Sequence, residues 1–202
     1  MIARAVIDRA IEDDSITSAG SYLSKSNHLI KDMLFQHGAQ AKDSDAGFDG
    51  TVCILDREAD RLEFAGANSS LFMVNHGEII ELKGDRKSVG ARRTRGSFEF
   101  TTQVVDRPSG MFVMLTDGVT DVMNELPRPT AFGRKRLMTL METLDTKDPK
   151  VLTSGIMEAV NGYRGDSELR DDLTLLAFYI DQLKQSSQPS SLKPEAEVEL
   201  NY

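Results

Sequence analysis

Hydrophobic residues recur at helical spacing at both ends of the folded part of the chain. In residues 1–14, Ile2, Val6, Ala10 and their apolar neighbours share one face, which predicts an amphipathic helix. The same period predicts helices over residues 18–38, 132–144 and 149–163, and Gly38 is a suitable helix stop. The first helix has no capping residue before it, which is the pattern expected of a domain truncated at its N-terminus.

Between the second and third helices the pattern becomes extended. Short runs rich in Val, Ile, Phe and Thr alternate with turns, which predicts a meander of antiparallel strands. The predicted strands cover residues 49–56, 61–67, 71–75, 78–83, 97–105 and 111–117, and a closing strand covers 173–180. Helices, strands, helices and a last strand predict an α+β fold with layered sheets of mainly antiparallel strands flanked by helices.

The C-terminal residues differ from the rest in composition. Residues 183–202 carry few large apolar side chains, and such segments do not bury enough surface to offset the entropy of ordering. We therefore expect one folded domain over residues 1–182, followed by a disordered tail over residues 183–202.

Charge and cysteine content exclude several classes of protein. A net charge of −8 disfavours binding to nucleic acid, because polyanions are captured by clustered Lys and Arg. Cys53 is the only cysteine, so neither an intrachain disulfide nor a cysteine-rich zinc site can form, which fits a cytoplasmic protein. No apolar run is long enough to span a bilayer, so membrane contact by this chain is not expected.

Two acidic stretches lie at the ends of predicted apolar strands. Asp117 follows one strand, and Asp171 and Asp172 precede the closing strand. If the two strands lie side by side, their carboxylates converge at one edge of the sheet. Mg²⁺ and Mn²⁺ prefer oxygen ligands and keep several waters, so a few carboxylates suffice to bind them. The spacing alone equally allows Asp117 to be a helix N-cap and the other two acids to end a loop.

The order of several motifs resembles the metal-dependent protein phosphatases of the PPM clan. These motifs are "FDGTVCILD", "LEFAGANSSLFMV", "GEIIELKGDRKSVG", "MLTDGVTDVMNE", "FGRKRL" and "RDDLTLLAF". The chain looks most like the bacterial branch typified by the sporulation phosphatase SpoIIE. The resemblance runs from about Met1 to about Ile180, and "TDGVTD" followed by "RDDLTLL" is its most specific part.

The resemblance implies a mechanism and a set of residues. In this family two Mn²⁺ or Mg²⁺ ions lie between two sheets and activate a bridging water that attacks phosphoserine or phosphothreonine. Asp117 and Asp171 match the family's C-terminal metal ligands, while Asp172, Asp121 and Asn68 lie in matching motifs without being assigned as ligands. Catalysis then needs no nucleophilic side chain. The implied partner is a phosphorylated regulatory protein, such as an anti-sigma-factor antagonist, with an upstream sensory domain or a dimer as possible control.

One motif of the family is missing. Relatives carry a "D-x-x-G-H-G" segment before the first long helix, which supplies an aspartate that bridges both metals, and this sequence contains none. We therefore expect a domain that is truncated at its N-terminus, with weaker metal binding. The alternative is a catalytically impaired pseudophosphatase that acts as a partner-binding module. A calcium-binding structural domain, suggested by "DGVTD", is disfavoured because an EF-hand places its acids in a loop between helices.

Three arginines gather in an otherwise acidic chain. Arg92, Arg93 and Arg95 form the stretch "GARRTRG", which could receive a phosphorylated or acidic partner. An exposed, solvated loop explains the same residues. The three histidines and Cys53 have no partners in sequence that indicate catalysis, and each fits a surface or packing position better.

Overall fold

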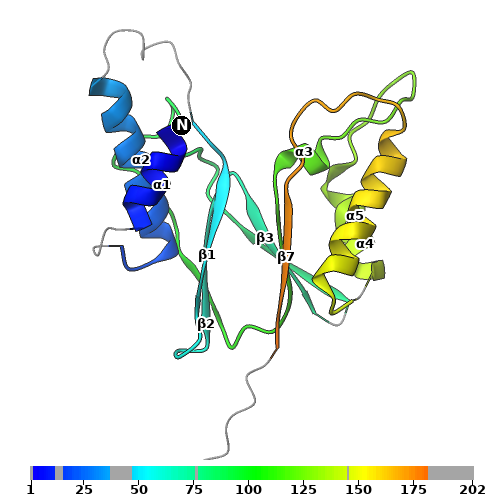
Figure 1. The fold of residues 1–202 in the computed structure, drawn as a ribbon, viewed down its shortest axis with the longest axis horizontal. Coiled ribbons are helices and arrows are strands. Elements are labelled where there is room, and N and C mark those ends of the chain that lie inside the picture. Colours follow the sequence, from blue (N-terminus) through cyan, green and yellow to red (C-terminus); the bar gives the residue numbers. More distant parts are fainter. Residues whose placement is uncertain (1, 12–15, 37–46, 76, 145, 182–202) are drawn as a thin grey trace, which may run out of the picture.

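The fold consists of two antiparallel sheets with helices on their outer sides (Figure 1). It is seen in a computed structural model that describes residues 2–11, 16–36, 47–75, 77–144 and 146–181. The predicted tail, Gly38, His37 and His76 lie outside the described residues. The α+β class predicted from the sequence is confirmed.

The helices and strands follow the predicted order. The helices are α1 (Ile2–Ile11), α2 (Ala19–Gln36), α3 (Asp117–Thr120), α4 (Gly133–Leu144) and α5 (Pro149–Arg164). The strands are β1 (Gly50–Asp56), β2 (Arg61–Ala67), β3 (Ser70–Asn75), β4 (Glu78–Lys83), β5 (Gln103–Asp106), β6 (Gly110–Leu115) and β7 (Leu175–Ile180). The one-turn helix α3 has no hydrophobic period of its own, and only the alternative interpretation of Asp117 as an N-cap placed a helix start here.

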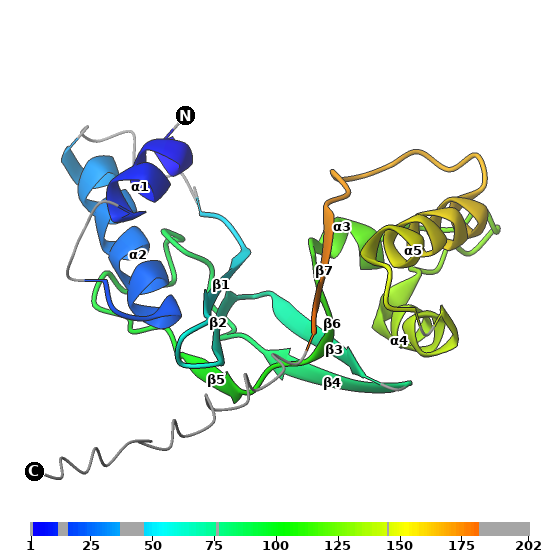
Figure 2. The ribbon, with the colours of Figure 1, turned by 60° about the horizontal axis from the view of Figure 1, so that its bottom comes forward.

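The strands do not form one continuous meander. They divide into a three-stranded sheet with the order β1-β2-β5 and a four-stranded sheet with the order β4-β3-β6-β7. Figures 1 and 2 show α1 and α2 on the outer side of the first sheet and α4 and α5 on the outer side of the second. The chain therefore forms four layers, and the inner faces of the sheets pack on each other.

Successive side chains of a single strand point to opposite faces of its sheet, so each strand contributes to two of the hydrophobic layers. In β2, Leu62 and Phe64 join the cluster between the sheets, while Ala65 packs toward α1 and α2. In β6, Phe112 joins the inter-sheet cluster, while Val113 packs toward α4 and α5. Each sheet is thus buried on both faces, which explains why β2 and β6 are almost continuously buried.

The predicted strand over residues 97–105 is mostly wrong, because only its end forms β5. The backbone before β5 bonds to the start of α2 instead of to a strand. Phe100 N donates to Ser24 Oγ at 2.8 Å, and Gly20 N donates to Thr102 Oγ1 at 2.9 Å. A Cβ on Gly20 would lie 2.3 Å from the Phe100 carbonyl oxygen, so glycine is needed for this approach.

Buried polar groups hold α2 against the rest of the protein. Glu63 accepts a hydrogen bond from Ala19 N at the helix N-terminus, where a carboxylate is favourable. The side chain of Asn27 is fully buried, accepts from Gly90 N at 2.9 Å and donates to Arg95 O at 2.8 Å. The loop between β4 and β5 is therefore fixed to α2.

No helix in the parts of the chain that the structure describes is long and apolar enough to cross a membrane.

The Asn27 contacts give a stability prediction. Asn27→Ala leaves the Gly90 N–H and the Arg95 carbonyl without partners, which lowers the free energy of unfolding by about 1–3 kcal/mol. Asn161→Ala, on the exposed face of α5, changes it by less than about 0.5 kcal/mol. Urea denaturation followed by circular dichroism measures both, and equal effects would show that the buried amide contributes nothing specific.

Candidate functional site

The pairing of β6 with β7 determines where the predicted acidic residues lie. The two strands are antiparallel, and their paired residues end with Leu115 opposite Leu175. Asp117 follows the end of β6, and Asp171 and Asp172 precede the start of β7. The prediction that the two acidic stretches meet at one end of the strands is confirmed.

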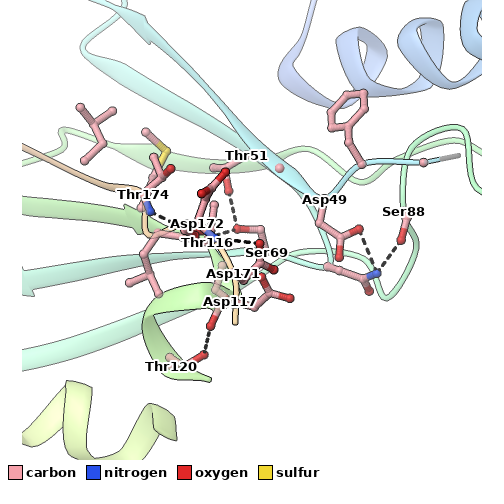
Figure 3. Close-up of a pocket in the computed structure, with 18 of the residues that line it drawn as sticks. Asp49, Thr51, Ser69, Ser88, Thr116, Asp117, Thr120, Asp171, Asp172 and Thr174 are labelled. Atoms are coloured by element: carbon pink, nitrogen blue, oxygen red, sulfur yellow. Dashed lines mark hydrogen bonds between the residues drawn. The ribbon is translucent and has the colours of Figure 1, made fainter. Parts of the chain in front are cut away.

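Two threonines extend the strand pairing beyond the sheet. Thr116 N donates to Thr174 O at 3.0 Å, and Thr174 N donates to Thr116 Oγ1 at 3.1 Å. The Thr116 hydroxyl donates in turn to Asp172 O at 3.2 Å. Figure 3 shows this connection, which fixes the backbone that carries the acidic side chains.

Gly118 allows α3 to approach the acidic segment before β7. A Cβ at this position would lie 2.4 Å from the Asp172 carbonyl oxygen. The neighbouring Val119 and Val122 are buried in the core under α4 and α5 and anchor the short helix. The backbone of "TDGV" is therefore held between the core and the Asp172 segment. The N-cap of α3 is Thr116, so Asp117 is not the cap that the alternative interpretation required.

A pocket of about 780 Å³ opens at this end of the sheets. Four exposed carboxylates line it: Asp49, Asp117, Asp171 and Asp172. Figure 3 shows Asp117, Asp171 and Asp172 near the β6–β7 end, with Asp49 on another side of the pocket. Four carboxylates around one pocket, with a single cationic residue among its described lining residues, give the pocket a negative potential that favours cations.

Asn68 connects Asp49 to Ser88 on the same side of the pocket, away from Asp117 and Asp171 (Figure 3). Its Nδ2 donates to Asp49 Oδ1 at 3.2 Å and to Ser88 Oγ at 2.9 Å. Asn68 has a φ of 49°, a left-handed conformation that asparagine tolerates better than most residues. The motif residue Asn68 thus organises the wall of the pocket. Asp121, in contrast, is not a lining residue and ends α3.

Sequence reasoning missed Asp49 as a pocket residue. It stands directly before β1, and the signal for it was its place in the motif "FDGTVCILD", as an acid beside a glycine at the start of a predicted strand. Its place in the pocket depends on the turn at Asn68 and on the backbone pairing of Phe48 with Val89, neither of which a local pattern reveals.

Arg134, near the start of α4, is the one cationic residue among the described residues that line the pocket. Its guanidinium donates to Glu81 Oε1 at 2.5 Å, and that carboxylate is largely buried. Much of its charge is therefore neutralised by a partner on β4. The acidic character of the pocket remains.

The donors in the pocket fit Mg²⁺ or Mn²⁺ in kind. Among the described residues neither histidine nor cysteine lines it, and carboxylate oxygens are the ligands these cations prefer. Within the described residues, however, no group of three or more His, Cys, Asp or Glu side chains is arranged to hold a metal ion. Asp117 and Asp171 share the pocket, and their role as metal ligands stays a prediction.

Groups that could serve another kind of catalysis lie elsewhere. Cys53 packs against Met114, and burial raises the pKa of its thiol to about 12. His28 lies on the exposed side of α2 beside Asp32, 3.2 Å away. Neither residue lines the acidic pocket.

Comparison with known proteins decides the family. A family model described as "Stage II sporulation protein E (SpoIIE)" matches residues 2–181. The chain belongs to the SpoIIE family. A search of curated proteins finds no significant match.

Solved structures similar to this SpoIIE-family chain are phosphatase domains. The SiaA-PP2C domain of Pseudomonas aeruginosa has a TM-score of 0.77 and 26% identity, covering 90% of this chain and 68% of that one. The phosphatase domain of SpoIIE from Bacillus subtilis, presoaked with Mn, has a TM-score of 0.56 and 15% identity, covering 90% and 74%. The catalytic domain of the phosphatase PstP, in complex with 2 manganese ions, has a TM-score of 0.57 and 14% identity, covering 89% and 80%. The SpoIIE-family chain is thus a protein phosphatase domain of the PPM type.

The close approach at Gly118 can be tested against a second glycine. Gly118→Ala forces α3 away from the Asp172 carbonyl and lowers the free energy of unfolding by about 1–3 kcal/mol. Gly162→Ala lies in α5, where a Cβ meets nothing within 4 Å, and raises it by about 0.5–1 kcal/mol. Chemical denaturation of both variants measures the difference. A Gly118→Ala protein as stable as wild type would show that α3 does not depend on this approach.

The raised pKa of Cys53 predicts an unreactive thiol. At pH 8 an unfolded cysteine, with a pKa of about 8.5, is partly ionised, whereas Cys53 in the folded protein is almost entirely protonated. We expect iodoacetamide to alkylate the folded protein at least about a hundredfold more slowly than the urea-unfolded protein. Mass spectrometry measures the two rates, and similar rates would contradict the burial of this thiol.

Proposed function

We propose that this chain hydrolyses phosphoserine or phosphothreonine on a regulatory protein partner, with Mn²⁺ or Mg²⁺ held by Asp117 and Asp171. The single observation that carries the proposal is the β6–β7 register, which brings two distant acidic stretches to one pocket. Membership of the SpoIIE family and the likeness to PP2C-type domains support it.

The residues of this chain have distinct tasks in the proposed reaction. Asp117 and Asp171 would supply carboxylate oxygens to the cations. The hydrogen bonds between Thr116 and Thr174 keep the two carboxylates on a rigid frame, so that little reorganisation is needed when cations enter. When bound, such cations lower the pKa of a coordinated water and neutralise phosphate oxygens.

A side-chain nucleophile has little support in the described residues. The thiol of Cys53 is protonated at neutral pH and lies outside the acidic pocket, and no histidine of the described part of the chain lines that pocket. A mechanism in which water attacks phosphorus directly needs neither. The acidic, open pocket suits it, because water and a phosphorylated side chain can both enter.

The proposed partner is a phosphorylated regulatory protein of the anti-sigma-factor-antagonist kind. Similar structures include a phosphatase domain of the "cell fate determinant" SpoIIE and PppA, described as a "key regulatory component of T6SS". PppA has a TM-score of 0.59 and shares 13% identity with this chain, so it shows the fold alone. These descriptions concern the neighbours' own regulatory roles, and a regulatory phosphoprotein as the substrate of this chain is our proposal.

The activity test compares two aspartates. The wild-type chain should release phosphate from a phosphothreonine peptide when Mn²⁺ is added, and EDTA should abolish the release. Asp117→Asn should lower kcat/KM by at least about a hundredfold, because the loss of a carboxylate weakens the site. Asp106→Asn removes an exposed carboxylate on β5, outside the pocket, and should change kcat/KM less than about twofold.

Two outcomes would overturn the proposal. Equal loss of activity in both variants would show that Asp117 has no special role. A well-folded wild-type chain that releases no phosphate at any Mn²⁺ or Mg²⁺ concentration would favour a partner-binding module over a phosphatase.

A further inference from the structure

A strongly basic loop borders the acidic pocket. Residues 85–96, here called the basic loop, contain five basic residues and one acidic residue in a chain whose net charge is −8. The basic residues are Arg86, Lys87, Arg92, Arg93 and Arg95. The acidic residue, Asp85, is engaged by Thr101, whose backbone N–H donates to its carboxylate at 2.7 Å.

The backbone of the basic loop is fixed by buried and half-buried groups. Val89 pairs with Phe48 through two backbone hydrogen bonds of 2.9 and 3.0 Å. From α2, Asn27 bonds to Gly90 and Arg95, and Lys31 Nζ donates to Ala91 O at 2.8 Å. A loop that served only as a solvated connection would need none of this support.

Inside the loop, one buried threonine closes the turn that presents the arginines. Thr94 is 2% exposed, its Oγ1 donates to Ser88 O at 2.7 Å, and its N–H donates to Ala91 O at 3.0 Å. The adjacent Arg93 and Arg95 are exposed. Positive charges are thus held on a preformed surface, which lowers the entropy lost when a partner binds.

The basic loop and the acidic pocket are continuous. Ser88 and Ala91 line the same pocket as Asp117 and Asp171, and Asn68 ties Ser88 to Asp49. Arg92 and Arg93 directly follow the lining residue Ala91 along the chain, so a polypeptide that places a phosphorylated side chain in the pocket can reach the basic loop beside it. Residues beside the phosphorylated one are the part of the substrate that meets this loop.

We propose that the basic loop is a docking surface for acidic side chains flanking the phosphorylated residue of the protein substrate, with Arg93 and Arg95 as its main contacts. The proposal rests on the proposed phosphatase function. It adds a preference for substrates with acidic residues beside the phosphorylated one. The acidic pocket would take the cations and the phosphate, while the arginines select acidic sequence around it.

The chemistry of the loop favours a protein over other polyanions. Residues 85–96 include no aromatic residue on which a base could stack, and the apolar Val89 is fully buried, which leaves no apolar anchor for a lipid surface. The overall charge of −8 also repels extended polyanions, whereas a short acidic segment meets only the local positive field.

The test uses two fluorescently labelled phosphothreonine peptides of equal length, one with acidic and one with neutral flanking residues. Binding is measured by fluorescence anisotropy in low and high salt, and hydrolysis is measured separately on the same peptides and on p-nitrophenyl phosphate. The variant is Arg93→Glu/Arg95→Glu. The matched control is Arg57→Glu/Arg107→Glu, which reverses two exposed charges beside Asp56 and Asp106, at the end of the three-stranded sheet away from the pocket residue Gly50.

We expect wild type to bind the acidic peptide roughly tenfold more tightly than the neutral one, with the difference shrinking as salt screens the charges. Arg93→Glu/Arg95→Glu should abolish this preference and raise KM for the acidic peptide, with kcat and the hydrolysis of p-nitrophenyl phosphate unchanged. Arg93→Lys/Arg95→Lys should keep most of the preference, and the control should keep all of it.

The outcomes separate this proposal from the proposed function. Charge-dependent binding without phosphate release would refute the phosphatase function and leave the docking surface standing. Hydrolysis without preference for the acidic peptide, or equal loss in the control variant, would overturn the docking surface. Tighter binding of single-stranded RNA or of phosphatidylserine vesicles, lost in the same arginine variant, would also overturn the assignment to a protein substrate.

Discussion

The antiparallel pairing of β6 with β7 is the constraint on which the functional site depends. The register places Leu115 opposite Leu175, and hydrogen bonds between Thr116 and Thr174 carry the pairing to the edge of the pocket. Asp117 and Asp171 are 54 positions apart along the chain, yet both reach one pocket because of this pairing. A slip of one residue would turn the apolar side chains of β7 to the wrong layers, so the cores on both faces of the sheet hold the register in place.

The packing of four layers explains how a rigid frame can carry an exposed acidic pocket. The strands are buried by helices on the outer sides and by each other on the inner sides, so the sheets have little freedom to shift. Side chains at the strand ends face solvent and need not be neutralised by protein groups. Gly118 lets α3 lie against the Asp172 segment, which sets the position of Asp117 without a direct hydrogen bond to its carboxylate. Stability and function are therefore supplied by different parts of the same strands.

Periodicity was sufficient to predict most helices and strands because each strand is bounded by turn residues and each long helix has a continuous apolar face. It failed where tertiary contacts determine the conformation of the backbone. Phe98 and Phe100 fit the alternating pattern of a strand, yet they pack against α2, and the Phe100 N–H donates to Ser24 Oγ. That Asp117 and Asp171 lie at one end of neighbouring strands was predictable because apolar strands of one core tend to be neighbours. Asp49 was not, because its position depends on the left-handed turn at Asn68 and on a loop 40 residues away.

The most direct measurement of the central claim is a double-mutant cycle on Mn²⁺ affinity, with Asp117→Asn, Asp171→Asn and the double variant studied by isothermal titration calorimetry. If the two carboxylates hold the same cation site, each single change weakens binding strongly and the double change adds little more, which gives a coupling free energy of at least about 1 kcal/mol. Additive effects, or single variants that bind Mn²⁺ as tightly as wild type, would contradict a site shared by the ends of β6 and β7.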